Sequence, residues 1–363
     1  MYCNTKILIG FTLAGWFILF GAACQGLSTP VQYEEKLMNA TQLNVPAQND
    51  YVPIYLQDGK LLIFTHLGPE SDLPANQSVL YLDYNSDPQT FQSLSLPQDE
   101  QCSFRTEYWV RGLLPDGRIG LFKTCFPSSG KIERYLMAFD WQTKTLEQIV
   151  APALPYGDSN FKFTWNPEMS RGVQAVSNVL RGTIYWITPN ETSPINVTIS
   201  DGKKGWSLGD TYDHALDGDK NFGIAGVPTW SPDGNQIAFV ASVQAISRST
   251  SPIYAARNIY LLDPVTEELT VALENIYRIE HMEWSPDSQW LAFDGQVGPN
   301  APRGVWLFAP QTGRLLFIYE GEWISTITWE RNMEHLVISR CLEFDCLNKP
   351  KGVFMLDIKG LVP

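Results

Sequence analysis

The sequence predicts an all-β fold, a six-bladed β-propeller of four-stranded antiparallel blades whose ring is closed by an N-terminal strand. Three observations predict it: a strand–turn–strand repeat, a second pair of strands after each copy, and a last unit that lacks one strand. The clearest copy is TWSPDGNQIAFVAS, from Thr229 to Ser242. It returns as EWSPDSQWLAFDG, from Glu283 to Gly295, with the tryptophan, the Ser-Pro-Asp turn and the Ala-Phe pair in register. Such self-similarity indicates an array of similar units.

Six units of this kind follow one another along the chain. Each has a large marker residue, then a polar turn, then a hydrophobic strand. In the clearest copy proline presets φ, aspartate caps its own backbone, and glycine takes the positive φ that a tight reversal needs. Departures from this turn occur at Ser288, at 166–168 (NPE) and at 330–332 (ERN). The marker residues are Tyr55, Leu113, Trp165, Trp230, Trp284 and Trp329.

A second pair of strands follows the first pair in the units. After Asn258 the sequence NIYLLDPVTEELTVAL predicts one strand over Ile259–Asp263 and another over Leu269–Leu273, with a turn between them. Similar pieces begin at Ser78, Tyr135, Thr183, Gly304 and Gly352. Four strands per unit is the pattern of a propeller blade.

The last unit lacks its fourth strand, because little chain follows the predicted strand Val353–Ile358. Residues 41–47 (TQLNVPA) are the expected donor of the missing strand. Pairing there would remove the exposed sheet edge of an open array. We therefore expect one domain over 41–363, with a long insertion at 200–226.

The repeat WSPDG…IAF…NIYLLDP resembles that of TolB-like proteins, also called the PD40 (WD40-like) β-propeller repeat. The resemblance is strongest in the fourth and fifth units and weakest in the first and sixth. It implies a β-propeller throughout the chain after residue 50.

The N-terminal segment predicts export. Lys6 precedes an apolar run that ends in small residues before Cys24, the order of a signal peptide over 1–23. GAAC resembles a bacterial lipobox, with Gly21 where leucine is usual, so Cys24 is the expected lipidation site. Plain secretion and an uncleaved anchor are the alternatives. Residues 24–40 are polar and are expected to form a tether.

The cysteines agree with an exported protein, and the net charge bears on nucleic-acid binding. Two local disulfides are expected, Cys102–Cys125 and Cys341–Cys346, with unpaired buried thiols as the alternative. Zinc ligation is poorly supported, because no C-x-x-C or paired histidines accompany them. The formal net charge is −13 without a basic cluster, which argues against nucleic-acid binding.

Two motifs in the acidic insertion point to chemistry that their context does not support. GWSLG, from Gly205 to Gly209, fits the G-x-S-x-G elbow of serine hydrolases, but a polar stretch and not a hydrophobic strand precedes Ser207. Asp217, Asp219 and Asn221 resemble the opening of a calcium loop, yet the sixth position is not glycine and no glutamate closes it. We predict no catalytic residue and a solvated loop, with calcium as the alternative.

The predicted ligand site is the mouth of the central channel, on the face opposite the Pro-Asp-Gly turns. Aromatic rings among a few charges there would suit a small polar ligand or a peptide end, and ordinary loop-face residues are the alternative. The four histidines lie at unmatched positions, so a multi-histidine metal centre is not expected. Four N-x-S/T sequons, at Asn39, Asn76, Asn190 and Asn196, are taken as incidental. The predicted mouth residues are Tyr108, Trp109, Asn160, Lys162, Glu280, His281 and Trp323.

These expectations add up to a monomeric, non-enzymatic binding or scaffolding module of the cell envelope. It would bind an envelope protein, a peptide or a small polar ligand without a cofactor, and would contact the membrane only through lipid. The alternatives are a secreted hydrolase or lyase acting on glycans or peptides at the channel mouth, and an accessory subunit of a separate enzyme.

Overall fold

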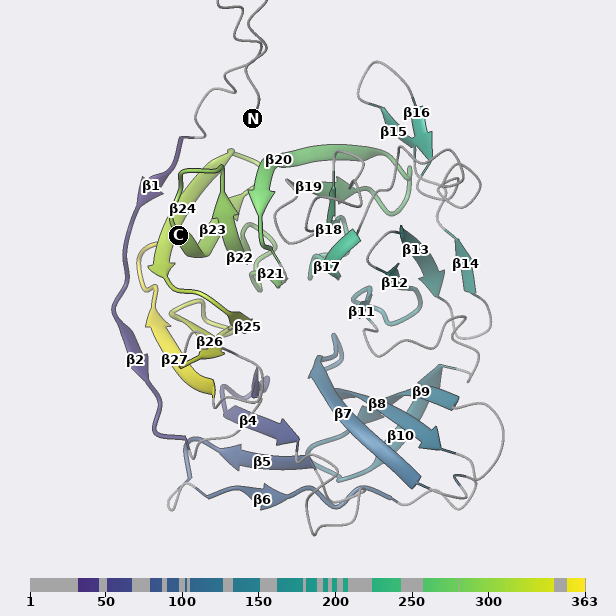
Figure 1. The fold of residues 1–363 in the computed structure, drawn as a ribbon. Coiled ribbons are helices and arrows are strands. Elements are labelled where there is room, and N and C mark those ends of the chain that lie inside the picture. Colours follow the sequence, from purple (N-terminus) through teal and green to yellow (C-terminus); the bar gives the residue numbers. More distant parts are fainter. Residues whose placement is uncertain are drawn as a thin grey trace, which may run out of the picture. The chain divides into compact units, whose positions relative to one another are not determined.

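The structure is a computed structural model in which strands are the regular elements of the described residues (Figure 1). This confirms the predicted all-β class. The chain divides into two units, Met1–Gln32 and Tyr33–Pro363. None of the described residues forms a helix long and apolar enough to cross a membrane. The predicted signal peptide and Cys24 lie outside the described residues, which are 32–45, 51–66, 79–86, 90–97, 102, 105–126, 133–150, 162–178, 181–187, 192–194, 198–200, 205–207, 224–242, 257–279, 281–342 and 351–362.

Three four-stranded antiparallel sheets come first in the second unit, each with its strands in sequence order. The first contains β3 (Val52–Tyr55), β4 (Leu61–His66), β5 (Val79–Asp83) and β6 (Gln92–Ser93). The second contains β7 (Arg105–Leu113), β8 (Ile119–Phe126), β9 (Glu133–Phe139) and β10 (Leu146–Val150). The third contains β11 (Lys162–Trp165), β12 (Gly172–Asn178), β13 (Arg181–Ile187) and β14 (Thr192–Pro194).

The fourth and fifth units share one nine-stranded sheet. The far end of β20 pairs with β22 as well as with β19. Ile276 lies opposite Arg257 of β19 and Val297 of β22, and Tyr277 lies opposite Gln296 of β22. The expectation of separate four-stranded sheets for these two units was therefore wrong. The strands are β17 (Ile224–Trp230), β18 (Ile237–Ser242), β19 (Arg257–Leu262), β20 (Leu269–Tyr277), β21 (Met282–Trp284), β22 (Leu291–Val297), β23 (Arg303–Ala309), β24 (Arg314–Glu320) and β1 (Glu34–Glu35).

The last sheet takes a strand from the N-terminal side. Its order is β2 (Ala40–Gln42), β27 (Lys351–Asp357), β26 (His335–Cys341) and β25 (Ile324–Trp329). Strand β2 pairs antiparallel with β27, Thr41 opposite Met355, and the Leu43 amide then donates to the Val353 carbonyl at 2.8 Å. The segment at 41–47 was the predicted donor for this sheet, and the observed strand begins one residue earlier.

The end of the expected tether is part of a sheet. Strand β1 pairs parallel with β24, and Tyr33 packs edge-on against Trp306 with ring centroids 4.9 Å apart. Glu34 accepts a hydrogen bond from Arg314 Nε at 3.0 Å. Backbone pairing therefore already holds the chain at Glu34, within the segment 24–40 that was expected to form a tether.

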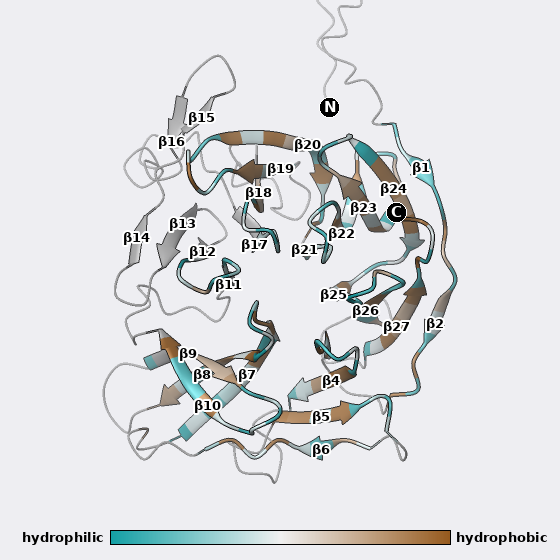
Figure 2. Cartoon of the chain, turned by 180° about the vertical axis from the view of Figure 1, so that it is seen from behind, coloured by the Kyte–Doolittle hydropathy of each residue, from teal (hydrophilic) through white to brown (hydrophobic). Residues whose placement is uncertain are grey.

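The hydrophobic core lies between neighbouring sheets. Leu316 of β24 clusters with Leu336 of β26, and Val337 on the same strand clusters with Ile63 of β4. The last sheet therefore contacts both the preceding sheet and the first one. Since the middle strands are covered on both faces, they are hydrophobic along their length, as the brown of β5, β19 and β26 shows against the teal of β1 (Figure 2). Each large apolar side chain buried this way contributes about 1.5–3 kcal/mol.

Six hairpin turns in the described residues share one pattern of two backbone hydrogen bonds, although the first bond spans four residues in the first two units and five in the other four. In each, the amide of the residue after the marker donates across the turn, as Ser231 does to the Gln236 carbonyl at 2.8 Å. A residue with positive φ then donates back, as Gly234 does to the Ser231 carbonyl at 2.9 Å. The departures from Pro-Asp-Gly therefore leave the turn unchanged. The positive-φ residues are Gly59, Gly117, Met169, Gly234, Ser288 and Met333.

A short extra hairpin precedes the fourth unit. Strand β15 (Thr198–Ser200) pairs antiparallel with β16 (Gly205–Ser207), and Ser207 lies opposite Thr198. Ser207 is therefore the last residue of a hairpin strand. Asp217, Asp219 and Asn221 lie outside the described residues, as does most of the insertion at 200–226.

Candidate functional site

A pocket of about 370 Å³ lies where the six hairpin turns converge. Each marker residue is the last residue of the first strand of its unit. Figure 1 shows β11, β17, β21 and β25 at the inner ends of their sheets. The first strands of the six units therefore end at the same place. All six markers line the pocket: Tyr55, Leu113, Trp165, Trp230, Trp284 and Trp329.

Indole hydrogen bonds tie adjacent units together at the pocket wall. Trp284 Nε1 donates to the Thr229 carbonyl at 3.1 Å, and Trp329 Nε1 donates to the Glu283 carbonyl at 3.2 Å. Each bond therefore runs from one marker to the residue just before the preceding marker. Net contributions of about 1 kcal/mol each are typical of such bonds. The wall between the fourth, fifth and sixth units is held in one arrangement before any ligand arrives.

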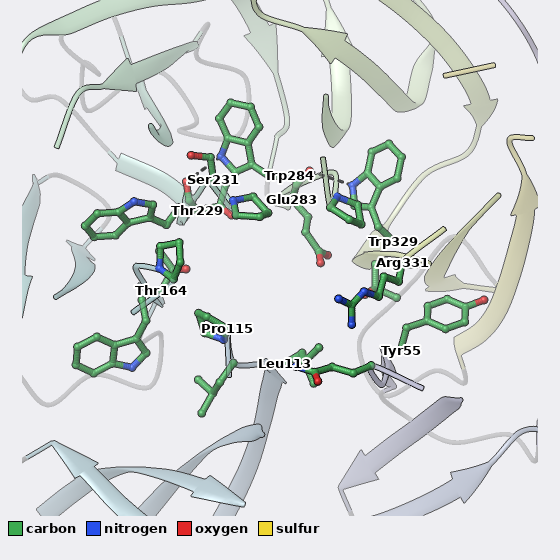
Figure 3. A pocket seen from close by; sticks show the side chains of 18 of the residues that line it. Tyr55, Leu113, Pro115, Thr164, Thr229, Ser231, Glu283, Trp284, Trp329 and Arg331 are labelled. Atoms are coloured by element: carbon green, nitrogen blue, oxygen red, sulfur yellow. Dashed lines mark hydrogen bonds between the residues drawn. The ribbon is translucent and has the colours of Figure 1, made fainter. Parts of the chain in front are cut away.

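The lining of the pocket combines polar and apolar side chains (Figure 3). The residue before the marker supplies a polar side chain in four successive units: Thr164, Thr229, Glu283 and Thr328. The first two units contribute Gln57 and an apolar wall of Leu56, Leu113, Leu114 and Pro115. Small-molecule sites combine these features, an apolar wall and a few polar groups that fix orientation.

Glu283 is the one carboxyl among the described lining residues. It lies in β21, partly buried, and its side chain turns toward the centre of the pocket (Figure 3). Within the described chain no donor or cation contacts this carboxyl. Burial raises the pKa of Glu283 to about 8, since desolvation disfavours the charged form. The group is therefore mostly protonated at neutral pH.

Arg331 brings a positive charge to the same pocket. It lies two residues after its marker, where four other units place proline, and its guanidinium points toward the pocket centre (Figure 3). The side chain is exposed, and in the described part of the chain it forms neither a hydrogen bond nor an ion pair. Tyr55 is the remaining titratable residue of the described lining, and burial raises its pKa above the usual range. The phenol therefore stays neutral.

The predicted mouth residues in the described part of the chain do not line this pocket. Tyr108 is buried, and its hydroxyl donates to the Pro97 carbonyl at 2.7 Å. Trp109 is 41% exposed and stacks on His66 with ring centroids 3.9 Å apart. The structure brings neither of them to the ends of the first strands.

The other predicted mouth residues are also spread over the molecule. The His281 amide donates to Asp294 Oδ1 at 2.7 Å. Trp323 is 36% exposed, and the Arg303 guanidinium lies 5.2 Å from its ring centroid. Lys162 begins β11, while Asn160 and Glu280 lie outside the described residues.

The ligand site was predicted at the starts of the first strands, whereas this pocket lies at their ends. The sequence did contain a signal for this pocket. Thr-Trp stands at 164–165, 229–230 and 328–329, and only the fifth unit replaces this threonine with glutamate. Glu283 therefore stands out, because it is a charged residue at a repeat position where three other units have threonine.

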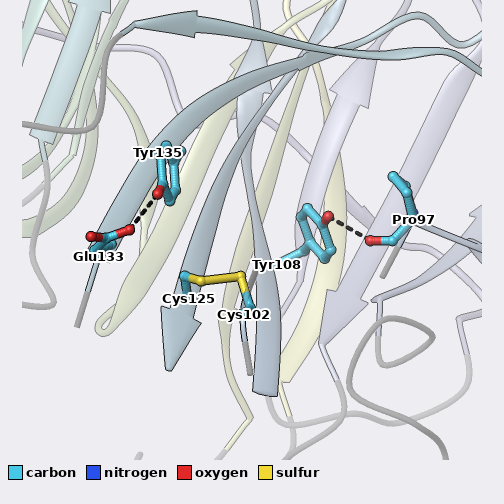
Figure 4. The surroundings of a disulfide bond; sticks show 6 residues. All are labelled: Pro97, Cys102, Tyr108, Cys125, Glu133 and Tyr135. Atoms are coloured by element: carbon cyan, nitrogen blue, oxygen red, sulfur yellow. Dashed lines mark hydrogen bonds between the residues drawn. A yellow bond between two sulfur atoms is a disulfide. The ribbon is translucent and has the colours of Figure 1, made fainter. Parts of the chain in front are cut away.

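The predicted Cys102–Cys125 disulfide is confirmed, and it lies beside β7 and β8 (Figure 4). Its Cα atoms are 5.1 Å apart, and both side chains are buried. A loop of this length contributes about 3 kcal/mol in the chain-entropy account. Cys341 is also disulfide-bonded, and its predicted partner, Cys346, lies outside the described residues. Within the described chain no three His, Cys, Asp or Glu side chains group as metal ligands.

No protein-family model matches the sequence, and no curated protein matches it either. Among solved structures, an α-L-arabinanase of Penicillium chrysogenum complexed with arabinobiose aligns with a TM-score of 0.52 and 14% identity, over 89% of this chain and 99% of the other. TolB from Acinetobacter baumannii aligns at 0.49 and 12% identity over 81% of this chain, which spans 63% of that TolB. An oligogalacturonate lyase from Vibrio parahaemolyticus aligns at 0.46 and 12% identity, over 90% and 100%. The alignment with the arabinanase shows that the chain has a β-propeller fold.

Proposed function

We propose that this protein is a non-enzymatic binding module that takes a small polar ligand into the central pocket. The observation that carries the proposal is the pocket itself, a site of about 370 Å³ built from all six repeat turns, with one acid and one base. Hydrolysis of glycans normally needs a pair of carboxyl groups, and covalent catalysis needs a nucleophile with an adjacent base. The described lining offers one carboxyl, that of Glu283, in place of such a pair, and the proposal assigns no catalytic residue and needs no cofactor.

The proposal includes a finer architecture, a six-bladed propeller over residues 41–363 with an insertion at 200–226. The six equivalent turns and the pairing of β2 with β27 support it. Rigid sheets around a central pocket suit a binding role, because loops and strand ends vary without disturbing the core.

We also propose that the protein acts at the cell envelope, after export, with Cys24 as its lipid-modified residue. The buried disulfide Cys102–Cys125 supports export, since such bonds persist in oxidising compartments. An envelope protein, a peptide or a small polar molecule is the class of partner that the proposal admits.

A ligand screen with a blocked pocket tests the proposed function. Leu113 is 41% exposed at the apolar wall, so Leu113→Trp fills the pocket with little risk to folding. The matched control is Val265→Trp, at an 87% exposed site outside the pocket lining. We expect at least one member of a metabolite and peptide panel to raise the melting temperature of the native protein and the control but not of Leu113→Trp.

Two outcomes contradict this proposal. The first is turnover of a glycan or peptide in the same panel by the native protein but not by Leu113→Trp, which would favour the hydrolase or lyase alternative. The second is a set of ligands whose stabilising effects are equal in Leu113→Trp and Val265→Trp. Such ligands would bind elsewhere on the molecule.

A further inference from the structure

We propose that the ligand of the central pocket is a small zwitterion, which places an ammonium group at Glu283 and a carboxylate at Arg331. This inference rests on the proposed function, because it names the class of ligand for the same pocket. Three features of the lining carry it: an acid and a base for which the described residues supply no partner, and an apolar wall beside them.

The acid requires a cationic partner. The Glu283 side chain projects into the pocket, and the protein supplies no partner for its carboxyl within the described residues (Figure 3). Its backbone carbonyl is already used, since it accepts from Trp329 Nε1 at 3.2 Å. An isolated carboxylate taken out of water is costly unless a cation or donors compensate it. An ammonium group on the ligand provides that compensation.

The base requires an anionic partner of a particular shape. Arg331 stands in the exposed turn after β25, and no ion pair joins it to Glu283 in the described chain. Its guanidinium is a planar fork, which matches a carboxylate through two parallel hydrogen bonds. The position is occupied by proline in the equivalent turns at Pro115, Pro167, Pro232 and Pro286. A donor therefore replaces a rigid apolar residue here.

The two charges together select a zwitterion. A simple cation would leave Arg331 without a partner and would be repelled by it. A simple anion would be repelled by the Glu283 carboxylate whenever it is ionised, and would leave that carboxylate without a cationic partner. A molecule with both charges satisfies both residues, and a short alkyl chain between them would lie against Leu113 and Pro115.

Protonation of Glu283 gives the inference a second observable. Burial raises the pKa of Glu283 to about 8, so an ammonium group that needs the carboxylate displaces a proton at neutral pH. The neighbouring elements face this group with Thr229 from β17, Thr328 from β25, and the titratable Tyr55 and Arg331. We expect affinity to rise about tenfold per pH unit below pH 8 and to level off above it.

The experiment compares ω-amino acids of increasing chain length, from glycine to 8-aminooctanoate. Isothermal titration calorimetry on the full chain measures each between pH 6 and pH 9, with n-alkylamines and n-alkanoates of equal length as matched ligands. We expect one chain length to bind best, at least tenfold tighter than either matched ligand, with release of about one proton at pH 6. Glu283→Gln should abolish the pH dependence. Arg331→Gln should keep it but lose the preference over the alkylamine.

Glu320→Gln, which removes an exposed carboxyl from β24 outside the pocket lining, is the matched control and should bind as the native protein does. Circular dichroism establishes that each variant is folded. The zwitterion inference is overturned if no ω-amino acid binds better than both of its matched ligands, or if both pocket variants bind unchanged. If the ligand screen still yields a molecule that Leu113→Trp excludes, the proposed function survives that result. If the screen yields no such molecule, both the zwitterion inference and the proposed function are contradicted.

Discussion

At the scale of single residues, Glu283 is where the repeat departs from its own pattern with a chemical consequence. Three other units place threonine at this register position, where a neutral hydroxyl faces the pocket. Glutamate keeps the backbone role of the position, because its carbonyl accepts the indole hydrogen bond of the next unit. The side chain therefore projects into the pocket while the hydrogen bond of the pocket wall stays in place.

The raised pKa of Glu283 makes a prediction about stability. An unfolded glutamate titrates near pH 4.3, whereas Glu283 in the fold titrates near 8. Between these values the folded state holds the extra proton, so the contribution of this residue is full below about pH 4 and is lost as the pH rises through 8. We expect Glu283→Gln to raise the melting temperature more at pH 9 than at pH 5.

Melting curves of the native protein and the variant at pH 5, 7 and 9 measure this effect, with Glu320→Gln as the control for the loss of one negative charge. An equal shift at all three pH values would contradict the prediction, because it would place the carboxyl in ordinary contact with water.

At the scale of elements, the six turns show how far the repeat tolerates substitution. Backbone hydrogen bonds and a positive φ recur at Met169, Ser288 and Met333, where glycine is absent. Ser288 gains a contact in exchange, since its hydroxyl accepts from the Asp233 amide of the neighbouring unit at 3.0 Å. The strands that flank the turn therefore determine its geometry as much as the turn residues do.

Two glycine substitutions separate backbone strain from crowding at these turns. Gly59 has φ of +83° and open space where the methyl group of an alanine would lie, whereas a methyl at Gly234 would lie 3.3 Å from Pro167 Cδ. Gly59→Ala should lower the free energy of unfolding by about 1 kcal/mol through the left-handed backbone alone. Gly234→Ala should cost more, because Pro167 must also give way. Urea titrations measure both, and equal losses would show that the contact with Pro167 carries no penalty.

The elements that could be predicted from sequence are those with a hydrophobic signature. Leu61–Thr65 is a run of buried residues, and the strand there was expected. Strand β1 leaves no such trace, because Glu34 and Glu35 are exposed and only their backbone pairs with β24. The joining of two units through β20 also leaves no signal in the sequence, since it depends on where Ile276 meets Val297 in space.

At the scale of the whole molecule, the repeat predicted the β-propeller fold, whereas the central pocket lies at the opposite ends of the first strands from the predicted mouth residues. Markers such as Trp284 indicate where a strand ends, and the convergence of six such ends is a property of the assembled sheets. The pocket therefore could not be located by reading any one unit. What the sequence did contain was the exception, Glu283, among the threonines.

The proposed membrane attachment is tested on the intact chain. Cys24→Ser should move the protein from the membrane fraction to the soluble fraction after cell lysis, because lipid at this cysteine is the proposed anchor. Immunoblots of the two fractions measure the shift, with Cys3→Ser as the matched control. Retention of Cys24→Ser in the membrane fraction would contradict lipid anchoring and favour an uncleaved N-terminal helix.

The pairing of β2 with β27 imposes an order in time. A ribosome makes Ala40–Gln42 long before Lys351–Asp357, so the sheet that contains both waits for the chain between them. Until then β2 has no partner, and the core between the first and last sheets, with Ile63 and Val337, stays open. Contacts between such distant segments form slowly and expose apolar surface meanwhile. A chain released before residue 351 would lack the partner strand altogether, and would present an open edge to other chains.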